Sequence, residues 1–209
     1  MDFKLALSIV GGLSSPSKMP CHGFSIPATE CKTGSKLRKV KGSICSICYA
    51  LKGRYSFGVV KQALTKRFAG LKHPAWVEAI SFLILKQEQS GFFRWHDSGD
   101  IQDLAHFKRI IRVCRMTPEV KHWLPTREYG IISSYVKGRG QIPNNLTVRL
   151  SAFMADSPPP ALLAKRLGVC TSGTSKATFD CPAPKQGNKC GDCRACWDKS
   201  IANVNYKTH

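Results

Sequence analysis

Residues 92–114 read FFRWHDSGDIQDLAHFKRIIRVC. In them a short apolar segment, 92–96, is followed by a polar turn around Gly99 and then by apolar residues at helical spacing. We predict a strand over 92–96 and a helix that begins with Asp100 as its N-cap. The apolar stripe of this helix consists of Leu104, Phe107, Ile110, Ile111 and Cys114. Strand, turn and helix in this order form the repeating unit of parallel α/β folds.

The same pattern returns twice further along the chain. Residues 122–125 predict a second strand, after which Thr126 caps a helix. Residues 146–152 predict a third strand, followed by a helix over 160–167. Repeated alternation indicates a parallel sheet or barrel with right-handed crossovers, and the strands are too few for an eight-fold barrel. We therefore predict the α/β class, as a small or partial (β/α) barrel with a cysteine-rich metal-binding C-terminal tail.

The N-terminal part of the chain is less regular. Residues 3–10 are mostly apolar and predict a buried strand closed by glycines. A turn-rich stretch over 14–42 follows, and stretches of this length in compact domains tend to be functional or disordered. Ser43 then predicts the N-cap of a helix over 43–52.

Two amphipathic helices come next, with apolar faces within 60–71 and 76–84. No linker is clean enough to separate a second domain. We expect one α/β domain over residues 1–209, in which residues 170–209 form a metal-stapled tail folded onto the rest.

Four cysteines near the C-terminus have the spacing C-x8-C-x2-C-x2-C. This spacing is closer to the binding run of a cubane iron–sulfur cluster than to a structural zinc site, which usually pairs two separated C-x2-C knuckles. A disulfide-tied tail is the alternative, but no signal peptide marks a secreted chain. We predict a 4Fe–4S cluster, with zinc as the alternative metal, held by Cys181, Cys190, Cys193 and Cys196.

A second C-x2-C pair, Cys45 and Cys48, falls in the helix predicted after Ser43. The pair could be redox-active, could ligate a metal, or could be two small buried apolar residues. A redox pair would need a thioredoxin-like βαβ context, so we favour metal ligands. Whether they share the metal of the tail or bind a second one stays open.

The chain is strongly basic, with 32 Lys and Arg against 13 Asp and Glu and a net charge of +19. Such a charge favours polyanionic partners, either nucleic acid or a phosphorylated or otherwise anionic small molecule, although a solvated basic surface explains it as well. The basic run at 36–41 could contact phosphate or could be an exposed loop. No window approaches the ~20 apolar residues of a membrane span, so we expect no membrane contact and a reducing cytoplasm.

Several polar residues map to the carboxyl ends of the predicted strands, where ligands bind in parallel α/β folds. His96 beside Asp97 suggests an acid–base or ligand pair, and a satisfied structural histidine is the alternative. Arg149 lies inside an apolar strand, so its guanidinium should face a carboxylate, an anionic ligand or a polar cavity. We assign His96, Asp97, Arg127 and Arg149 to a catalytic pocket and Ser98 and Asp100 to cofactor binding.

With these residues assembled, the chain resembles a bacteriophage family called gene product 88-like. The resemblance covers nearly the whole chain and implies a phage origin and the cytoplasm of the host cell, without implying a particular activity. The matching segments are 17–21, 42–55, 94–100, 124–129 and 190–197.

A more distant resemblance is to radical S-adenosylmethionine enzymes, which hold a cubane cluster at the mouth of a partial barrel. This sequence departs from their C-x3-C-x2-C loop, because Cys45 and Cys48 have no third thiol at that spacing. We keep the analogy of fold and leave out the cofactor.

The leading expectation is an iron–sulfur protein with a redox or electron-transfer role on an anionic substrate, served by an electron-donor protein. Arg127 and Arg149 would hold the anion, and His96 would move a proton. The main alternative is a zinc-stapled nucleic-acid-binding protein without catalysis. A third reading is a metal-dependent hydrolase that uses His96, Asp97 and Asp100 as ligands.

Overall fold

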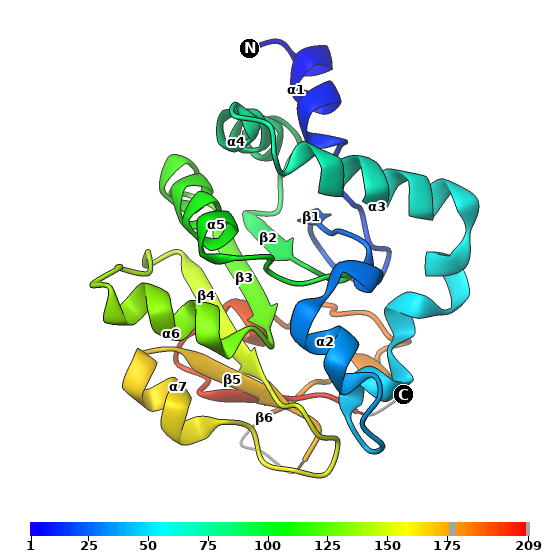
Figure 1. Ribbon diagram of the computed structural model, residues 1–209, viewed down its shortest axis with the longest axis vertical. Helices are drawn as coiled ribbons and strands as arrows, with labels where there is room; N and C mark the ends of the chain where they lie inside the picture. The colour runs from blue at the N-terminus through cyan, green and yellow to red at the C-terminus, as the bar shows by residue number, and fades with distance from the viewer. Residues whose placement is uncertain (176–178, 208–209) are drawn as a thin grey trace.

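The computed structural model describes residues 1–175 and 179–207. Within them, seven strands form one sheet in the order β1-β2-β3-β4-β5-β7-β6, and every pair of neighbours is parallel (Figure 1). The predicted parallel α/β architecture is confirmed, and the barrel stays a prediction. The strands are β1 (Gly23–Phe24), β2 (Phe92–Trp95), β3 (Lys121–Thr126), β4 (Leu146–Ser151), β5 (Cys170–Gly173), β6 (Phe179–Asp180) and β7 (Asn203–Asn205).

Helices α4 to α7 succeed one another along one side of the sheet (Figure 1). Their apolar faces and the sheet residues turned toward them form the main core, which includes Phe93, Trp95 and Leu124. The α-helices are α1 (Phe3–Val10), α2 (Lys32–Leu37), α3 (Gly58–Gly70), α4 (Trp76–Gln87), α5 (Leu104–Met116), α6 (Tyr129–Lys137) and α7 (Ala161–Leu167). Short 3₁₀ turns are η1 (Ala28–Glu30), η2 (Ile44–Ile47), η3 (Tyr49–Leu51), η4 (Gly53–Ser56), η5 (Ala183–Lys185) and η6 (Ala195–Trp197).

The opposite side of the sheet, which we call the inner face, is also covered. Side chains alternate along a strand, so Arg94 and Trp123 point away from the helices that Phe93 and Leu124 contact. All six residues of β4 are buried, which requires cover on both sides. On the inner face this cover comes from the connection between β6 and β7.

Residues 3–10 form helix α1, so the predicted strand is wrong. The Asp2 side chain accepts a hydrogen bond from the backbone N–H of Leu5 at 2.8 Å, and Gly11 ends the helix in the left-handed region at φ 77°. Ala6, Ile9 and Val10 are the buried residues, and this spacing places them on one helical face.

The helix after β2 begins later than predicted. Asp103, not Asp100, is the N-cap of α5, and its carboxylate accepts the backbone N–H of His106 at 2.7 Å. Asp100 therefore does not cap this helix. Ser43 caps its element as predicted, with its hydroxyl accepting from Ser46 N–H at 3.1 Å, but that element is the 3₁₀ turn η2.

The C-terminal part of the chain is built into the sheet. Strand β5 pairs with β4, and β7 lies between β5 and β6. The sequence had suggested irregular chain here, because these strands are short and rich in Thr, Ser and Asn. Of the helices in the described residues, none has the length and apolar character needed to cross a bilayer.

Candidate functional site

The connection between β6 and β7 carries the tail cysteines and is fastened to the inner face by Arg149. This side chain is 0% exposed, and its five N–H groups all donate to backbone carbonyl oxygens, over distances of 2.7–3.1 Å. The acceptors are the carbonyls of Thr171, Ala195, Cys196, Asp198 and Ile201. The guanidinium therefore faces backbone rather than a carboxylate or a ligand, and no donor remains to hold a substrate.

Aromatic packing completes this attachment. The indole N–H of Trp197 donates to the carbonyl of Phe93 at 2.9 Å, and the Thr147 hydroxyl donates to the carbonyl of Trp197 at 2.7 Å. The Trp197 ring meets Phe92 and Trp123 edge-on, each with centroids 5.3 Å apart. The segment around Cys196 is thus fixed to β2, β3 and β4.

The four tail cysteines lie on the one connection between β6 and β7, and their convergence on a metal stays a prediction. Burial is the main cause of the raised pKa of the Cys190 thiol, and the charges of Cys181 and Cys193 raise it further. Burial likewise raises the pKa of Cys196 to about 12; its sulfur lies 3.2 Å from the Tyr206 hydroxyl, and Cys181 also acts on it. The thiols of Cys190 and Cys196 are therefore protonated at neutral pH unless a cation joins them.

All ten cysteines are free thiols, which removes the disulfide-tied tail. Within residues 1–175 and 179–207, no three Cys, His, Asp or Glu side chains converge closely enough to hold a metal ion as they stand. His96, Asp97 and Asp100 are among the side chains that do not converge, so the predicted hydrolase arrangement is not formed there.

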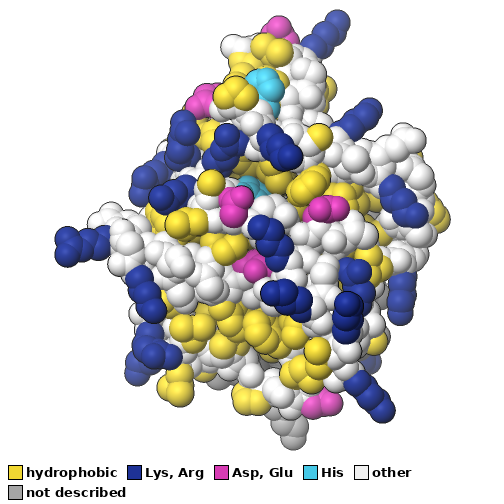
Figure 2. Space-filling view, in the orientation of Figure 1, with side chains coloured by type: hydrophobic (Ala, Val, Ile, Leu, Met, Phe, Trp, Pro, Cys, Tyr) yellow, Lys and Arg dark blue, Asp and Glu magenta, His cyan; other side chains and the backbone are white. Residues whose placement is uncertain are grey.

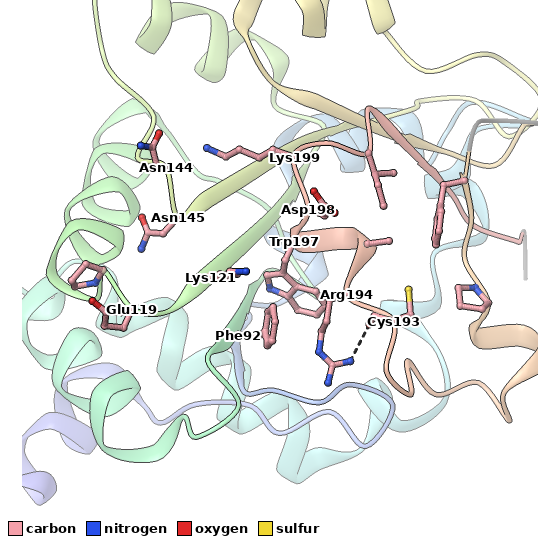
Figure 3. Close-up of a pocket in the computed structure, with 15 residues that line it drawn as sticks. Phe92, Glu119, Lys121, Asn144, Asn145, Cys193, Arg194, Trp197, Asp198 and Lys199 are labelled. Carbon is pink, nitrogen blue, oxygen red and sulfur yellow. Dashed lines mark hydrogen bonds between the residues drawn. The ribbon is translucent and has the colours of Figure 1, made fainter.

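A pocket of about 910 Å³ opens at the amino ends of β2, β3 and β4, bordered by the tail (Figure 3). Lys121, Arg194 and Lys199 bring positive charge to its wall, where Glu119 and Asp198 also lie. The Cys193 sulfur lies at its margin, and the Arg194 guanidinium stacks 5.2 Å from the Phe92 ring centroid. This cationic pocket lies at the amino ends of the strands, whereas the sequence predicted a cationic pocket at their carboxyl ends.

At the carboxyl ends of the strands, Asp100 holds β3 to the turn after β2. One carboxylate oxygen accepts from the N–H of Ile101 at 2.8 Å and from the hydroxyl of Thr126 at 2.7 Å, and the other accepts from the N–H of Arg127 at 2.9 Å. Burial raises the pKa of Asp100 to about 6 against these hydrogen bonds. Both oxygens are occupied, so Asp100 positions the backbone rather than a cofactor.

Arg127 lies beside Asp100, with its Nε donating to the carbonyl of Ala152 at 3.0 Å. Its charge lowers the pKa of the Cys45 thiol, against the larger effect of burial, which raises it. Arg127 therefore acts on the second predicted cysteine pair, Cys45 and Cys48, through its charge on Cys45, and not on the cysteines of the tail.

His96 is turned into the helical side of the sheet. Its ring lies among Phe24, Trp95 and His106, 4% of the residue is exposed, and neither ring nitrogen has a partner in the described residues. Burial holds the pKa of His96 well below its usual value, so the ring is neutral. Ser98, also buried, uses its carbonyl to accept from the N–H of Ile26 at 3.1 Å. Neither residue reaches the inner face.

Asp97 belongs to a network that the sequence did not reveal. The hydroxyl of Tyr55 donates to its Oδ2 at 2.6 Å, and the hydroxyl of Tyr49 donates to its backbone carbonyl. Arg94 contacts Tyr49 at 3.5 Å, stacks 4.5 Å from the Trp123 ring centroid, and keeps its Nε without a partner in the described residues. Arg94, like Arg149, interrupts an apolar strand, and that signal could have identified it.

A second group of cysteines covers the carboxyl edge, and it includes Cys31 in addition to the predicted pair. Cys31 is the residue before α2. Cys45 lies in the turn η2, against which α2 packs, and Cys48 is the C-cap of that turn. A side chain added at Gly34 would lie 3.6 Å from the sulfur of Cys31 and 3.6 Å from that of Cys45. The two sulfurs therefore flank the same point in space.

Comparison with known proteins gives one result. The family model for Gene product 88 matches residues 5–199. The chain belongs to the Gene product 88 family. Searches of curated proteins and of solved structures found no match, and the resemblance to radical S-adenosylmethionine enzymes is not shown.

The part matched by the Gene product 88 model contains both groups of cysteines and ends before β7. The segments that carry the resemblance come together on the inner face and at the carboxyl edge. The N–H of Cys190 donates to the carbonyl of Lys18 at 3.0 Å, and the hydroxyl of Tyr49 donates to the carbonyl of Asp97. Segments distant in sequence thus bring the cysteine loops to fixed places on the sheet.

Proposed function

We propose that this member of the Gene product 88 family is an iron–sulfur protein whose tail cysteines hold a 4Fe–4S cluster with a redox or electron-transfer role on an anionic substrate. The ligands would be Cys181, Cys190, Cys193 and Cys196. The observation that carries the proposal is that these four cysteines lie on one loop that Arg149 fastens to the sheet, with Cys193 at the margin of a cationic pocket.

The energetics allow the thiols to close around a metal. Each cysteine side chain held off its staggered rotamer by such a rearrangement would cost about 0.5–1.5 kcal/mol. Thiolate coordination of a metal yields about 10–16 kcal/mol in small zinc-binding domains. Binding therefore outweighs the rearrangement, and it also releases the protons that burial keeps on Cys190 and Cys196.

Positive charge supports both parts of the proposal. Arg94 and Arg149 each lower the pKa of Cys196 against the effect of burial, so they favour its thiolate form. In the pocket, Lys121, Arg194 and Lys199 would bind the anionic substrate. An iron–sulfur cluster supplies single-electron transfer when it is bound, and an electron-donor protein would supply the electrons.

The test is preparation of the protein without oxygen, followed by iron and sulfide analysis and a spectrum around about 400 nm, where clusters of this type absorb. We expect a brown protein whose Cys190→Ser variant loses that iron and sulfide. Cys170→Ser, at a buried cysteine of β5, is the matched control and should keep them. Colourless protein that contains zinc alone would remove the proposal.

The alternative, a zinc-stapled nucleic-acid-binding protein without catalysis, is favoured by exposed basic residues. Lys36, Lys39 and Lys41 are exposed at the end of α2 and just after it. Elsewhere on the visible face, Lys and Arg are spread out rather than gathered (Figure 2). This reading predicts RNA or DNA binding with a steep salt dependence that weakens in the triple lysine-to-alanine variant and persists in Arg94→Gln.

A further inference from the structure

Strands β2 and β4 each place one arginine on the inner face, and the two guanidinium groups are bonded very differently. Every N–H group of Arg149 donates to a backbone carbonyl. In Arg94, Nη1 donates to the Met19 sulfur at 3.1 Å, Nη2 lies 3.5 Å from the Tyr49 hydroxyl, and Nε is buried without a partner in the described residues. A thioether is a weak acceptor. Arg94 therefore keeps donors that the fold does not use, whereas Arg149 keeps none.

The carboxylate of Asp97 is incomplete in the same way. Its Oδ2 accepts from the Tyr55 hydroxyl at 2.6 Å, but its Oδ1 is buried and has no partner in the part of the chain that the structure describes. Tyr49 joins the two charged residues, because its hydroxyl contacts Arg94 and donates to the backbone carbonyl of Asp97. Within residues 1–175 and 179–207, neither charge is in an ion pair. A guanidinium and a carboxylate thus lie close together without binding each other.

A third unsatisfied group lies against the guanidinium. The Trp123 ring centroid is 4.5 Å from the Arg94 Cζ, so the indole stabilises the cation by stacking, but its face accepts none of the N–H groups that point along the guanidinium plane. The indole N–H of Trp123 is itself buried without a partner in the residues described. Buried polar groups in native proteins are nearly always hydrogen-bonded, and each exception calls for an explanation. Three exceptions in one cluster, from Arg94, Asp97 and Trp123, are typical of a site that binds a polar ligand.

The cover over this cluster comes from segments outside the sheet. Met19 belongs to the loop before β1, and Tyr49 and Tyr55 belong to the 3₁₀ turns η3 and η4. Tyr49 is 48% exposed, and Met19, Tyr55, Arg94 and Asp97 are each partly exposed. A methionine side chain is unbranched and flexible, so rotation of Met19 would free the Nη1 group that it contacts. A small molecule can therefore reach the guanidinium from solvent without a change in the sheet.

The charges of this cluster define the ligand that would fit it. Arg94 and Asp97 together carry no net charge, and a single guanidinium is a poor match for a phosphate dianion, which is usually bound by several cations. The planar fork of a guanidinium matches a carboxylate, which it binds through two parallel N–H···O bonds. The Oδ1 atom of Asp97 needs a donor, and an ammonium group there would also lie near the Tyr49 and Tyr55 rings, which attract cations.

From this arrangement we infer that Arg94 and Asp97 form a binding site for a free α-amino acid, with the carboxylate of the ligand on Arg94 and its ammonium group on Asp97. The site is separate from the cationic pocket of the proposed function, whose described lining contains neither of these residues. None of the contacts that build it involves a tail cysteine, so binding should not require a metal.

The test begins with the unaltered full-length protein and the common amino acids. Each is added at about 10 mM, which reveals millimolar binding as a rise in the unfolding temperature. The amino acid with the largest effect is then titrated by isothermal calorimetry beside two of its derivatives. The N-acetyl derivative lacks the ammonium group and the carboxamide lacks the carboxylate, so we expect each to bind at least about tenfold more weakly. Inorganic phosphate should bind more weakly than the amino acid.

Variants assign each charge of the ligand to its residue. Arg94→Gln should weaken binding of the amino acid at least about tenfold and should affect the carboxamide much less, because the carboxamide lacks the charge that Arg94 pairs with. Asp97→Asn should discriminate in the same way between the amino acid and its N-acetyl derivative. Arg112→Gln, at an exposed ion pair with Glu78, is the matched control and should bind as the parent does. Cys190→Ser should also bind normally, which separates this site from the tail cluster.

Three results would each overturn the inference. The first is that no amino acid raises the unfolding temperature. The second is that the carboxamide, the N-acetyl derivative or phosphate binds the unaltered protein as tightly as the amino acid does. The third is that Arg94→Gln keeps the affinity of the parent. Because the comparison of derivatives uses the unaltered protein, it decides the matter even if Arg94→Gln does not fold.

Discussion

The Nε of Arg149, in the middle of strand β4, donates a hydrogen bond to the carbonyl oxygen of Cys196 at 3.0 Å. The other four N–H groups of the same guanidinium bind carbonyls on either side of that cysteine and on β5. A charge buried in the sheet is thus stabilised by the backbone of the cysteine loop, and the loop is ordered by the charge. Arg149 therefore contributes both to the stability of the fold and to the order of the loop proposed to hold the cluster.

Replacing Arg149 by lysine should therefore destabilise the fold. An ammonium has three donors, so at least two of the five carbonyls would lose their partner, at about 1–3 kcal/mol each. Urea unfolding should show a loss of at least about 2 kcal/mol. The control is Arg112→Lys, at an exposed ion pair with Glu78, which should change stability by less than about 1 kcal/mol. Similar effects at both positions would contradict the anchoring role.

Tyr206 should tune the proposed tail cluster. Its hydroxyl lies 3.2 Å from the Cys196 sulfur, and hydrogen bonds to ligand sulfurs stabilise the reduced, more negative state of a cluster. Tyr206→Phe should lower the reduction potential by an amount on the order of tens of millivolts, as measured by redox titration. Tyr55→Phe removes a hydroxyl that binds Asp97 instead and should leave the potential unchanged. An unaltered potential in Tyr206→Phe would exclude Cys196 as a ligand.

Acid should destabilise the protein through its buried histidines. Burial lowers the pKa of His106 to about 3 and that of His122 to about 3, against about 6.5 in an unfolded chain. Between these values only the unfolded chain takes up the proton. The contribution of these neutral histidines to the free energy of unfolding is fully present above about pH 6.5. It is lost as the pH falls, by about 1.4 kcal/mol per pH unit for each histidine.

Asp100 acts in the opposite sense. Its pKa is raised to about 6, so the folded chain takes up a proton that the unfolded chain does not, between about pH 6 and 4. It offsets one histidine in that range. Urea unfolding from pH 7.5 to 4.5 should give a shallower slope for His122→Asn than for the parent, with His73→Gln, at an exposed histidine, unchanged. Identical slopes for the parent and His122→Asn would contradict the assignment.

The turn after β2 depends on Gly99. Its φ is 80°, and a methyl group there would stand 2.8 Å from the carbonyl oxygen of Ile26. Gly99→Ala should cost about 1–3 kcal/mol or more in unfolding free energy, from strain and from the displaced backbone. Gly130→Ala is the matched case, because nothing lies within 4 Å of that position in α6. It should stabilise the helix by about 0.5–1 kcal/mol, so thermal unfolding should move in opposite directions for the two variants.

The central elements could be read from periodicity, since β2 to β4 and α3 to α7 are long enough to show it. The apolar run at 3–10 was ambiguous, because a run of this length suits a buried strand or a buried helix, and Asp2 and Gly11 are what distinguish the helix. Strands β1, β6 and β7, two or three residues long, carry too little pattern to be recognised.

Some features of the candidate sites could likewise be predicted from the sequence, and others could not. Local spacing placed the four tail cysteines on one loop and Cys45 and Cys48 at one turn, while their roles as metal ligands stay a prediction. It was insufficient to bring Cys31 to that pair, because the approach depends on how α2 packs on η2. For Arg149, burial in an apolar strand was foreseeable, whereas its backbone partners arise from a chain reversal far along the sequence.

The position of β7 has a consequence for biosynthesis. Residues 203–205 fill the gap between β5 and β6, yet they are translated after both. Until residues 203–205 have left the ribosome, β6 lacks the strand with which it pairs, and the loop that carries the tail cysteines is attached to the sheet at one end only. If the tail holds the proposed cluster, its assembly should therefore follow, rather than accompany, emergence of the last strand.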